Sequence, residues 1–279
     1  MKFRLNPFKI YSDIENGKTY IKPLNIFFAI LIIIIDVHIV KFIEPNLLKL
    51  LRYLDLSNEF LFNSTLFIIQ MFAGLISLNI VVLLIEKKTP DINATSNSFA
   101  LDFIYVITLI LGFRFLYEGS IYQLKNLLAI DFTVNSILLS CIYAPFIEEL
   151  MYRGFILNGM IKKYPPHIAL FFSSAIFGIM HLSFFQSINA FLIGMIIGYL
   201  FIKTKSLYLC IFIHFCNNFI VMYLPTVFFD SFITTFIYSV FNLILGSSLI
   251  WFSMDKMKLK KRKKIFSDYD EEFNFFVEE

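Results

Sequence analysis

The sequence predicts an all-α protein, a polytopic membrane helix bundle of about eight transmembrane helices. Of the 279 residues, 58% are hydrophobic and only 16% are charged, and the mean hydropathy is +0.74. Apolar segments recur along the whole chain, and most are long enough to cross a bilayer as a helix. This composition is typical of an integral membrane protein, so we expect membrane lipid around it and no nucleic acid as a partner.

The first residues are polar and basic, and no small-residue cleavage site follows the first apolar segment. We therefore predict an uncleaved first span rather than a signal peptide. A bilayer crossing needs roughly 17 apolar residues. On this criterion the predicted spans are residues 24–40, 60–85, 99–117, 131–161, 168–182, 187–202, 207–224 and 227–252.

The basic residues predict the orientation, because loops rich in Lys and Arg stay on the cytoplasmic side. With both termini cytoplasmic, 19 of the 24 Lys and Arg residues lie on the cytoplasmic side and 4 on the outer side, while Arg114 lies inside a span. The opposite orientation would reverse this asymmetry. We therefore predict a cytoplasmic N-terminus and a cytoplasmic C-terminus.

Several polar residues within the spans have structural interpretations. Asp36 and His38 lie near the predicted outer end of the first span, where an interfacial or water-facing position is expected. Arg114 and Glu118 are four residues apart, so they share a helix face and can neutralise each other. The cysteines form no CxxC pair and are interpreted as small core residues. They are Cys141, Cys210 and Cys216.

The segment 144–155 carries three charges within an apolar stretch, which indicates a functional site. On a helix Glu149 and Arg153 are four positions apart and can pair. Glu148 is turned by about 100° from Glu149 and has no local partner of opposite charge. A carboxylate without such a partner in poorly solvated surroundings is suited to act as a general base.

Two histidines lie in the spans that follow this segment. A Lys-Lys-Tyr-Pro-Pro sequence predicts a turn at 162–166, so the spans before and after it form an antiparallel hairpin. Glu148 lies 17 residues before Pro165 and His181 lies 15 residues after Pro166, which predicts similar depths. In a later span His214 and Asn218 share a helix face.

These residue types indicate hydrolysis. A carboxylate and an imidazole can deprotonate water, while a second imidazole and an amide can stabilise an oxyanion. One alternative is a zinc site with Glu148, His181 and His214 as ligands, although the sequence has no HExxH motif. Another is a thiol nucleophile at Cys210, which a buried apolar setting disfavours. We expect no cofactor and no metal.

The motifs resemble those of the CPBP intramembrane proteases, also called the Abi or type II CAAX endopeptidase-like family. The EExxxR motif is present from Glu148 to Arg153, the FxxxH motif from Phe177 to His181, and the HxxxN motif from His214 to Asn218. The resemblance extends to Gly154, Gly194 and Gly198, and it covers residues 136–223. It divides the chain into an N-terminal part at 1–130, a catalytic core at 131–224, and a last helix with a polybasic and then acidic tail at 225–279.

The resemblance implies a role for each motif residue. Glu148 activates water with the help of His181, Glu149 and Arg153 form a supporting ion pair, and His214 and Asn218 form the oxyanion site. These residues are the predicted catalytic set.

The resemblance also implies an endopeptidase that acts on a small membrane-bound or amphipathic peptide or protein. Bacterial members are linked to maturation of peptide pheromones and bacteriocins and to self-immunity. The abundance of Ile, Lys, Asn and Phe is typical of an AT-rich bacterial genome, so we expect a multi-pass protein of the bacterial plasma membrane. The alternative is a non-catalytic immunity or signalling-scaffold protein of the same fold, with a neighbouring transporter or sensor protein as its partner.

Overall fold

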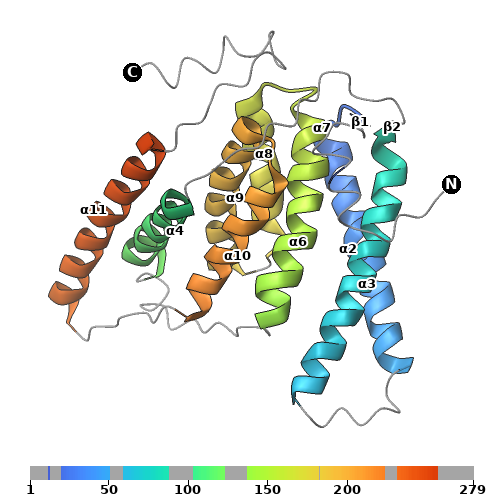
Figure 1. Cartoon of the computed structure of the whole chain (residues 1–279), viewed down its shortest axis with the longest axis horizontal. Helices are drawn as coiled ribbons and strands as arrows, with labels where there is room; N and C mark the ends of the chain where they lie inside the picture. Colours follow the sequence, from blue (N-terminus) through green and yellow to red (C-terminus); the bar gives the residue numbers. More distant parts are fainter. Residues whose placement is uncertain are drawn as a thin grey trace.

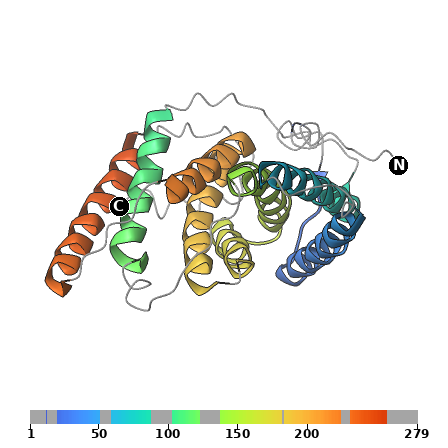
Figure 2. The same cartoon turned by 90° about the horizontal axis from the view of Figure 1, so that it is seen from below.

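The computed structural model describes residues 12, 20–50, 59–87, 103–122, 137–181, 183–223 and 231–256. In these residues the chain is helical apart from short turns and one pair of two-residue strands, which confirms the predicted all-α fold. Figure 1 shows a central group of helices, α6 to α10, with the α2–α3 pair on one flank and the α4–α11 pair on the other. Figure 2, seen from below, shows the same order of the three groups.

Four helices of the described residues are long and apolar enough to cross a membrane, at 26–49, 61–85, 184–204 and 232–256. Each falls on a predicted span. Shorter apolar helices occupy Pro166–Ile179 and Leu207–Tyr223, again on predicted spans. The predicted orientation of the termini and the predicted division into three parts stay predictions.

The first flank consists of α2 (Ile26–Leu50) and α3 (Glu59–Ile85). Helix α2 extends ten residues beyond the predicted end of its span, with Pro45 inside it, because the apolar pattern continues after residue 40. Asp36 therefore lies in the middle of α2 and not near its end. Its carboxylate accepts a 2.5 Å hydrogen bond from the Ser77 hydroxyl of α3, so the polar groups of the two helices satisfy each other.

One end of this flank is tied to the central group by backbone hydrogen bonds. Strands β1 (Tyr20–Ile21) and β2 (Glu86–Lys87) pair in antiparallel fashion. The N–H of Leu24 donates to the carbonyl of Gly159 at 2.9 Å. A Cβ atom added at Gly159 would lie 2.5 Å from Leu24 Cγ, so only glycine allows this close approach.

The segment that carries the two glutamates is one continuous helix whose winding changes along its length. It comprises η3 (Leu138–Tyr143), α6 (Ala144–Glu149), η4 (Leu150–Leu157) and α7 (Asn158–Met160). The η stretches are wound as a π-helix, which is rare and occurs frequently at functional sites. Every residue of η4 is buried, so this helix lies at the centre of the bundle.

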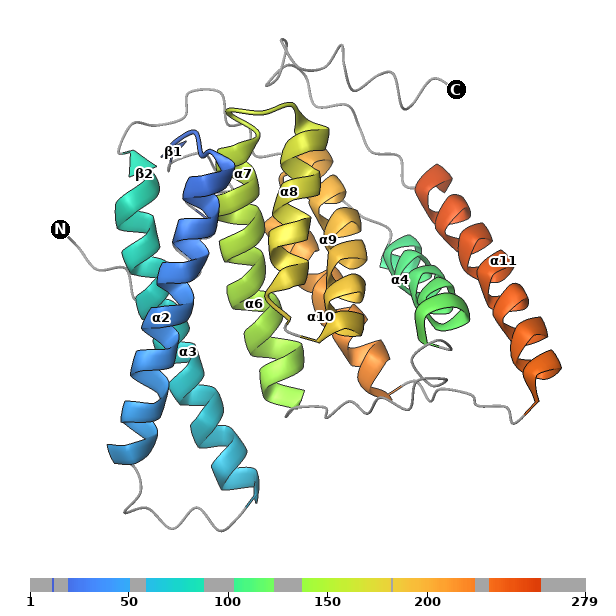
Figure 3. The same cartoon turned by 180° about the vertical axis from the view of Figure 1, so that it is seen from behind.

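Three further helices complete the central group: α8 (Pro166–Ile179), α9 (Phe184–Thr204) and α10 (Leu207–Tyr223). The predicted turn before Pro166 is confirmed, because Pro165 is extended and α8 begins directly after it. Seen from behind, α8 and α9 lie side by side beyond α6 and α7 (Figure 3). The α8–α9 hairpin and α10 thus enclose the helix that carries the glutamates.

The second flank consists of α4 (Phe103–Tyr117), continued by η2 (Glu118–Tyr122), and α11 (Phe232–Lys256). The predicted ion pair is present, with 3.8 Å between Arg114 Nε and Glu118 Oε2. The hydroxyl of Tyr238 on α11 donates to Glu118 Oε1 at 3.3 Å. The charges of Arg114 and Glu118 are therefore neutralised and hydrogen-bonded between the two helices.

Candidate active site

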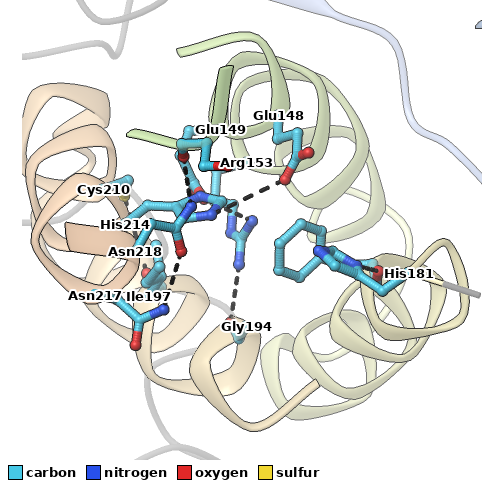
Figure 4. A network of polar contacts seen from close by, with 12 residues as sticks. Glu148, Glu149, Arg153, His181, Gly194, Ile197, Cys210, His214, Asn217 and Asn218 are labelled. Carbon is cyan, nitrogen blue, oxygen red and sulfur yellow. Dashed lines mark hydrogen bonds and ion pairs between the residues drawn. The ribbon is translucent and has the colours of Figure 1, made fainter. Parts of the chain in front are cut away.

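Glu149 is the centre of a buried polar network (Figure 4). Its Oε1 atom accepts a hydrogen bond from Arg153 Nη1 at 3.0 Å and another from His214 Nδ1 at 2.7 Å. The side chain of Glu149 is 0% exposed. A buried carboxylate is tolerated when it is both paired and hydrogen-bonded, and here an arginine and a histidine from two different helices meet that requirement.

Arg153 makes three kinds of contact from η4. Besides its ion pair with Glu149, its Nη2 donates to the carbonyl of Gly194 on α9 at 3.3 Å. Its guanidinium carbon lies 4.6 Å from the centre of the Phe177 ring on α8. A planar guanidinium can donate sideways and stack at the same time, which an ammonium group cannot do. Arg153 therefore joins three helices around the network.

Gly194 lies directly against the Phe177 ring and the Arg153 guanidinium. A Cβ atom at this position would lie 3.1 Å from Phe177 Cδ1 and 3.5 Å from Arg153 Nη2. The phenylalanine ring and the guanidinium both pack against α9 at this position. Only the contact with Phe177 would be tighter than an ordinary van der Waals contact, so a larger residue at 194 would require that ring to shift.

Glu148 differs from its neighbour in accessibility. Its side chain is 29% exposed, whereas that of Glu149 is fully buried. Glu148 Oε2 lies 4.0 Å from His214 Nε2, and within the described residues this oxygen has no hydrogen-bond partner. Each nitrogen of His214 thus faces a different glutamate. Because Nδ1 is held by Glu149, Nε2 is the nitrogen directed toward Glu148.

His181 lies in the turn between α8 and α9, apart from the Glu149 network (Figure 4). Its Nδ1 lies 3.0 Å from the carbonyl oxygen of Phe177. A carbonyl can only accept, so Nδ1 carries the proton and Nε2 is the basic nitrogen of the neutral ring. The Phe177 ring packs edge-on against both imidazoles, with centroids 5.0 Å from His181 and 5.8 Å from His214.

Asn218 lies one turn after His214 on α10, as predicted, but its amide is already engaged. Its Nδ2 donates to the backbone carbonyl of Ser140 at 2.7 Å, and its Oδ1 accepts from Asn217 Nδ2 at 3.1 Å. This side chain ties α10 to the start of the helix that carries the glutamates.

The structure brings Glu148, Glu149, Arg153 and His214 together, and the predicted Glu149–Arg153 pair is present as an ion pair. The structure places Glu148 near His214, with 4.0 Å between Glu148 Oε2 and His214 Nε2, and the expected assistance of Glu148 by His181 stays a prediction. Counting residues from the turn predicts how deep a side chain lies in the hairpin, but not the direction in which it points around the helix axis. The count could therefore not predict which histidine Glu148 faces.

Three groups that hydrogen-bond to the predicted site residues were not predicted from the sequence. They are the carbonyl of Gly194, the carbonyl of Ser140, and the amide of Asn217. Backbone acceptors leave no side-chain signal. The adjacent pair of asparagines at 217 and 218 was visible in the sequence, however, and two consecutive amides inside an apolar helix could have indicated both.

The residues considered for zinc do not converge as ligands. Among the described residues, no group of three or more His, Cys, Asp or Glu side chains is arranged to hold a metal ion. Cys210 is buried, and its sulfur lies 3.2 Å from the carbonyl of Ser206, the residue directly before α10. The same sulfur lies 3.9 Å from the carbonyl of Ile197 on α9, so both of these contacts are with backbone carbonyls.

The fold and the site together define a membrane protein with a charged network enclosed by its central helices. Residues 131–220 match the family model described as type II CAAX prenyl endopeptidase Rce1-like, which confirms the resemblance to the CPBP family. The matched region contains all six predicted site residues. Protease activity is the property of that family. Comparison with curated proteins gives no match, and comparison with solved structures gives none.

Proposed function

We propose that this protein is an intramembrane endopeptidase that hydrolyses a peptide bond with water activated by Glu148 and His181. The observation that carries the proposal is the contrast between two adjacent glutamates. Each glutamate has a buried Oε2 atom without a hydrogen-bond partner among the described residues. Glu149, however, is fully buried and its Oε1 binds Arg153 and His214, whereas the side chain of Glu148 is 29% exposed. One carboxylate organises the site and the other is available to water.

The chemistry proceeds by general base and then general acid catalysis. Glu148 takes a proton from water as the water oxygen attacks the carbonyl carbon of the scissile bond. The tetrahedral intermediate then collapses, the C–N bond breaks, and the proton held by Glu148 passes to the leaving amine. His181 assists through Nε2, the basic nitrogen left by its Nδ1–H bond to Phe177.

The oxyanion of the intermediate needs a hydrogen-bond donor. When His214 is protonated on both nitrogens, Nδ1–H is held by Glu149 and Nε2–H is left for the oxyanion. The distance between His214 Nε2 and Glu148 Oε2 is 4.0 Å, which is longer than a hydrogen bond. The two side chains therefore do not bind each other, and Nε2–H can donate to a substrate oxygen. Asn218 contributes by fixing α10 against the carbonyl of Ser140.

The substrate proposed is a small membrane-bound or amphipathic peptide or protein, because the site is enclosed by apolar helices. The setting that the family resemblance supports is the plasma membrane of a bacterium, in maturation of a peptide pheromone or bacteriocin or in self-immunity. No cofactor is needed for this chemistry, since water is the nucleophile.

The test is reconstitution of the full-length protein in lipid vesicles with amphipathic peptides, in water enriched in ¹⁸O. We expect cleavage, with one ¹⁸O atom in the new carboxylate of the N-terminal product. We expect Glu148→Ala and His181→Ala variants of equal expression to lose cleavage.

The same two variants separate this proposal from the scaffold alternative. A non-catalytic immunity or signalling protein depends on its fold and not on the carboxylate of Glu148. If both variants, folded and expressed at normal level, still restored the cellular phenotype of a deletion strain, the protease proposal would be rejected.

A further inference from the structure

The position of His181 depends on the turn in which it lies. Helix α8 ends at Ile179 and α9 begins at Phe184, so His181 belongs to neither helix. Its N–H donates to the carbonyl of Gly178 at 3.1 Å, and its own carbonyl accepts from the N–H of Ser183 at 2.6 Å. His181 is therefore held on one side by the end of α8, through Gly178 and Phe177, and on the other by Ser183, the residue directly before α9.

The start of α9 is held from outside the central group. The hydroxyl of Tyr117, the last residue of α4, donates a buried 3.1 Å hydrogen bond to the carbonyl of Phe185. Phe185 is the second residue of α9 and lies four positions after His181. Tyr117 is only 6% exposed and Phe185 only 3%, so the bond is shielded from solvent and lipid.

Helix α4 is a firm support for this hydroxyl. It packs closely on α11 at two glycines, and a Cβ atom at Gly112 would lie 2.9 Å from the carbonyl oxygen of Gly246. The hydroxyl of Tyr238 on α11 bonds to Glu118, the residue directly after Tyr117. The close packing of α4 on α11 thus fixes the position of Tyr117, which in turn binds the first turn of α9.

We propose that Tyr117 is a positioning residue for His181, acting through the first turn of α9. The inference rests on the proposed function, since it assigns Tyr117 to the hydrolytic site. It also gives the α4–α11 flank, which lies outside the matched residues 131–220, a role in that site. Tyr117 contacts the backbone of α9 and does not touch the substrate.

The test compares Tyr117→Phe with Tyr105→Phe in the full-length protein. Tyr105 is also on α4, and its ring packs against Phe252 of α11. Each variant loses one hydroxyl from the same helix. Two readouts are used: steady-state kinetics on a cleaved peptide, and the imidazole ¹⁵N resonances of the four histidines, with that of His181 assigned from a His181→Gln spectrum.

We expect Tyr117→Phe to lower kcat by about tenfold with KM changed less than about twofold, because a misplaced assisting group weakens the transition state more than substrate binding. We expect the His181 resonance to move in Tyr117→Phe and to stay in place in Tyr105→Phe. Should Tyr117→Phe not fold, Tyr117→Met, which keeps an apolar side chain and also has no O–H or N–H donor, replaces it, with the same shift of the His181 resonance expected.

An unmoved His181 resonance would overturn the inference, and so would a moved resonance with unchanged kcat in an active protein. The two proposals fail separately. If the wild-type protein cleaved no peptide, the proposed function would fail, while the resonance comparison would still decide whether Tyr117 positions His181.

Discussion

Glu149 and His214 lie 65 positions apart in the chain, and yet Glu149 Oε1 and His214 Nδ1 are separated by only 2.7 Å. This bond joins the helix with the EExxxR motif to the helix with the HxxxN motif. It also decides which nitrogen of His214 is directed toward Glu148. Glu149 is therefore more than the partner of Arg153, because it orients the histidine that faces the second glutamate.

The role of Glu149 predicts a loss of stability when its charge is removed. In Glu149→Gln, Arg153 would stay buried without a counter-charge, since its only carboxylate contact given by the described residues is Glu149. Leaving a buried charge unpaired costs about 3–5 kcal/mol. Thermal unfolding in detergent should show a large fall in Tm. A Tm equal to that of wild type would contradict the central position of Glu149.

Arg153→Lys tests whether geometry matters as well as charge. Lysine keeps the positive charge, but it cannot bond Glu149 and the Gly194 carbonyl while stacking on Phe177. We expect a loss of about 1–3 kcal/mol in the free energy of unfolding, on the scale of one or two buried charge-assisted hydrogen bonds. The exposed Lys163→Arg serves as a control that should change nothing. Equal stability of both variants would show that a point charge is sufficient at 153.

Phe177→Leu tests the aromatic link between the two histidines. The ring lies edge-on to both imidazoles and under the Arg153 guanidinium. Such aromatic contacts contribute about 0.5–1.5 kcal/mol each beyond buried area. We expect kcat to fall more than tenfold, a larger loss than in Phe171→Leu, a substitution on the same helix at a half-exposed ring. The measurement is steady-state cleavage per folded molecule, and equal rates in the two variants would remove Phe177 from the site.

Metal removal tests the hydrolytic mechanism in a different way. Since Glu148, His181 and His214 do not converge as ligands, we expect cleavage to survive prolonged treatment with a strong chelator. The assay is peptide cleavage before and after chelation, followed by addition of zinc. A loss of activity that zinc restores would instead support the metal alternative.

Much of the fold could be predicted from the sequence, because apolar length alone marks a bilayer span. The helices of the described residues fall on the predicted spans, and the Pro165–Pro166 turn was predicted from the missing N–H groups and the fixed backbone angle of proline. The length of α2 was not predicted. The predicted span ended at residue 40, but the helix continues to Leu50.

The candidate site could be predicted in its residues but not in its contacts. The pair Glu149–Arg153 followed from four-residue helical spacing, which is local. The contact of Glu149 with His214 depends on how two distant helices rotate against each other, and Asp36 bonding Ser77 depends on the same kind of information. No spacing within one helix contains that information.

The most direct test of the account compares Glu148→Gln with Glu149→Gln in one experiment, measuring Tm and peptide cleavage for each purified variant. The account predicts that Glu148→Gln keeps the Tm of wild type and loses cleavage by about a thousandfold or more, the scale of general base catalysis. It predicts that Glu149→Gln loses stability first. A stable, inactive Glu149→Gln beside an active Glu148→Gln would contradict the assignment of the two carboxylates.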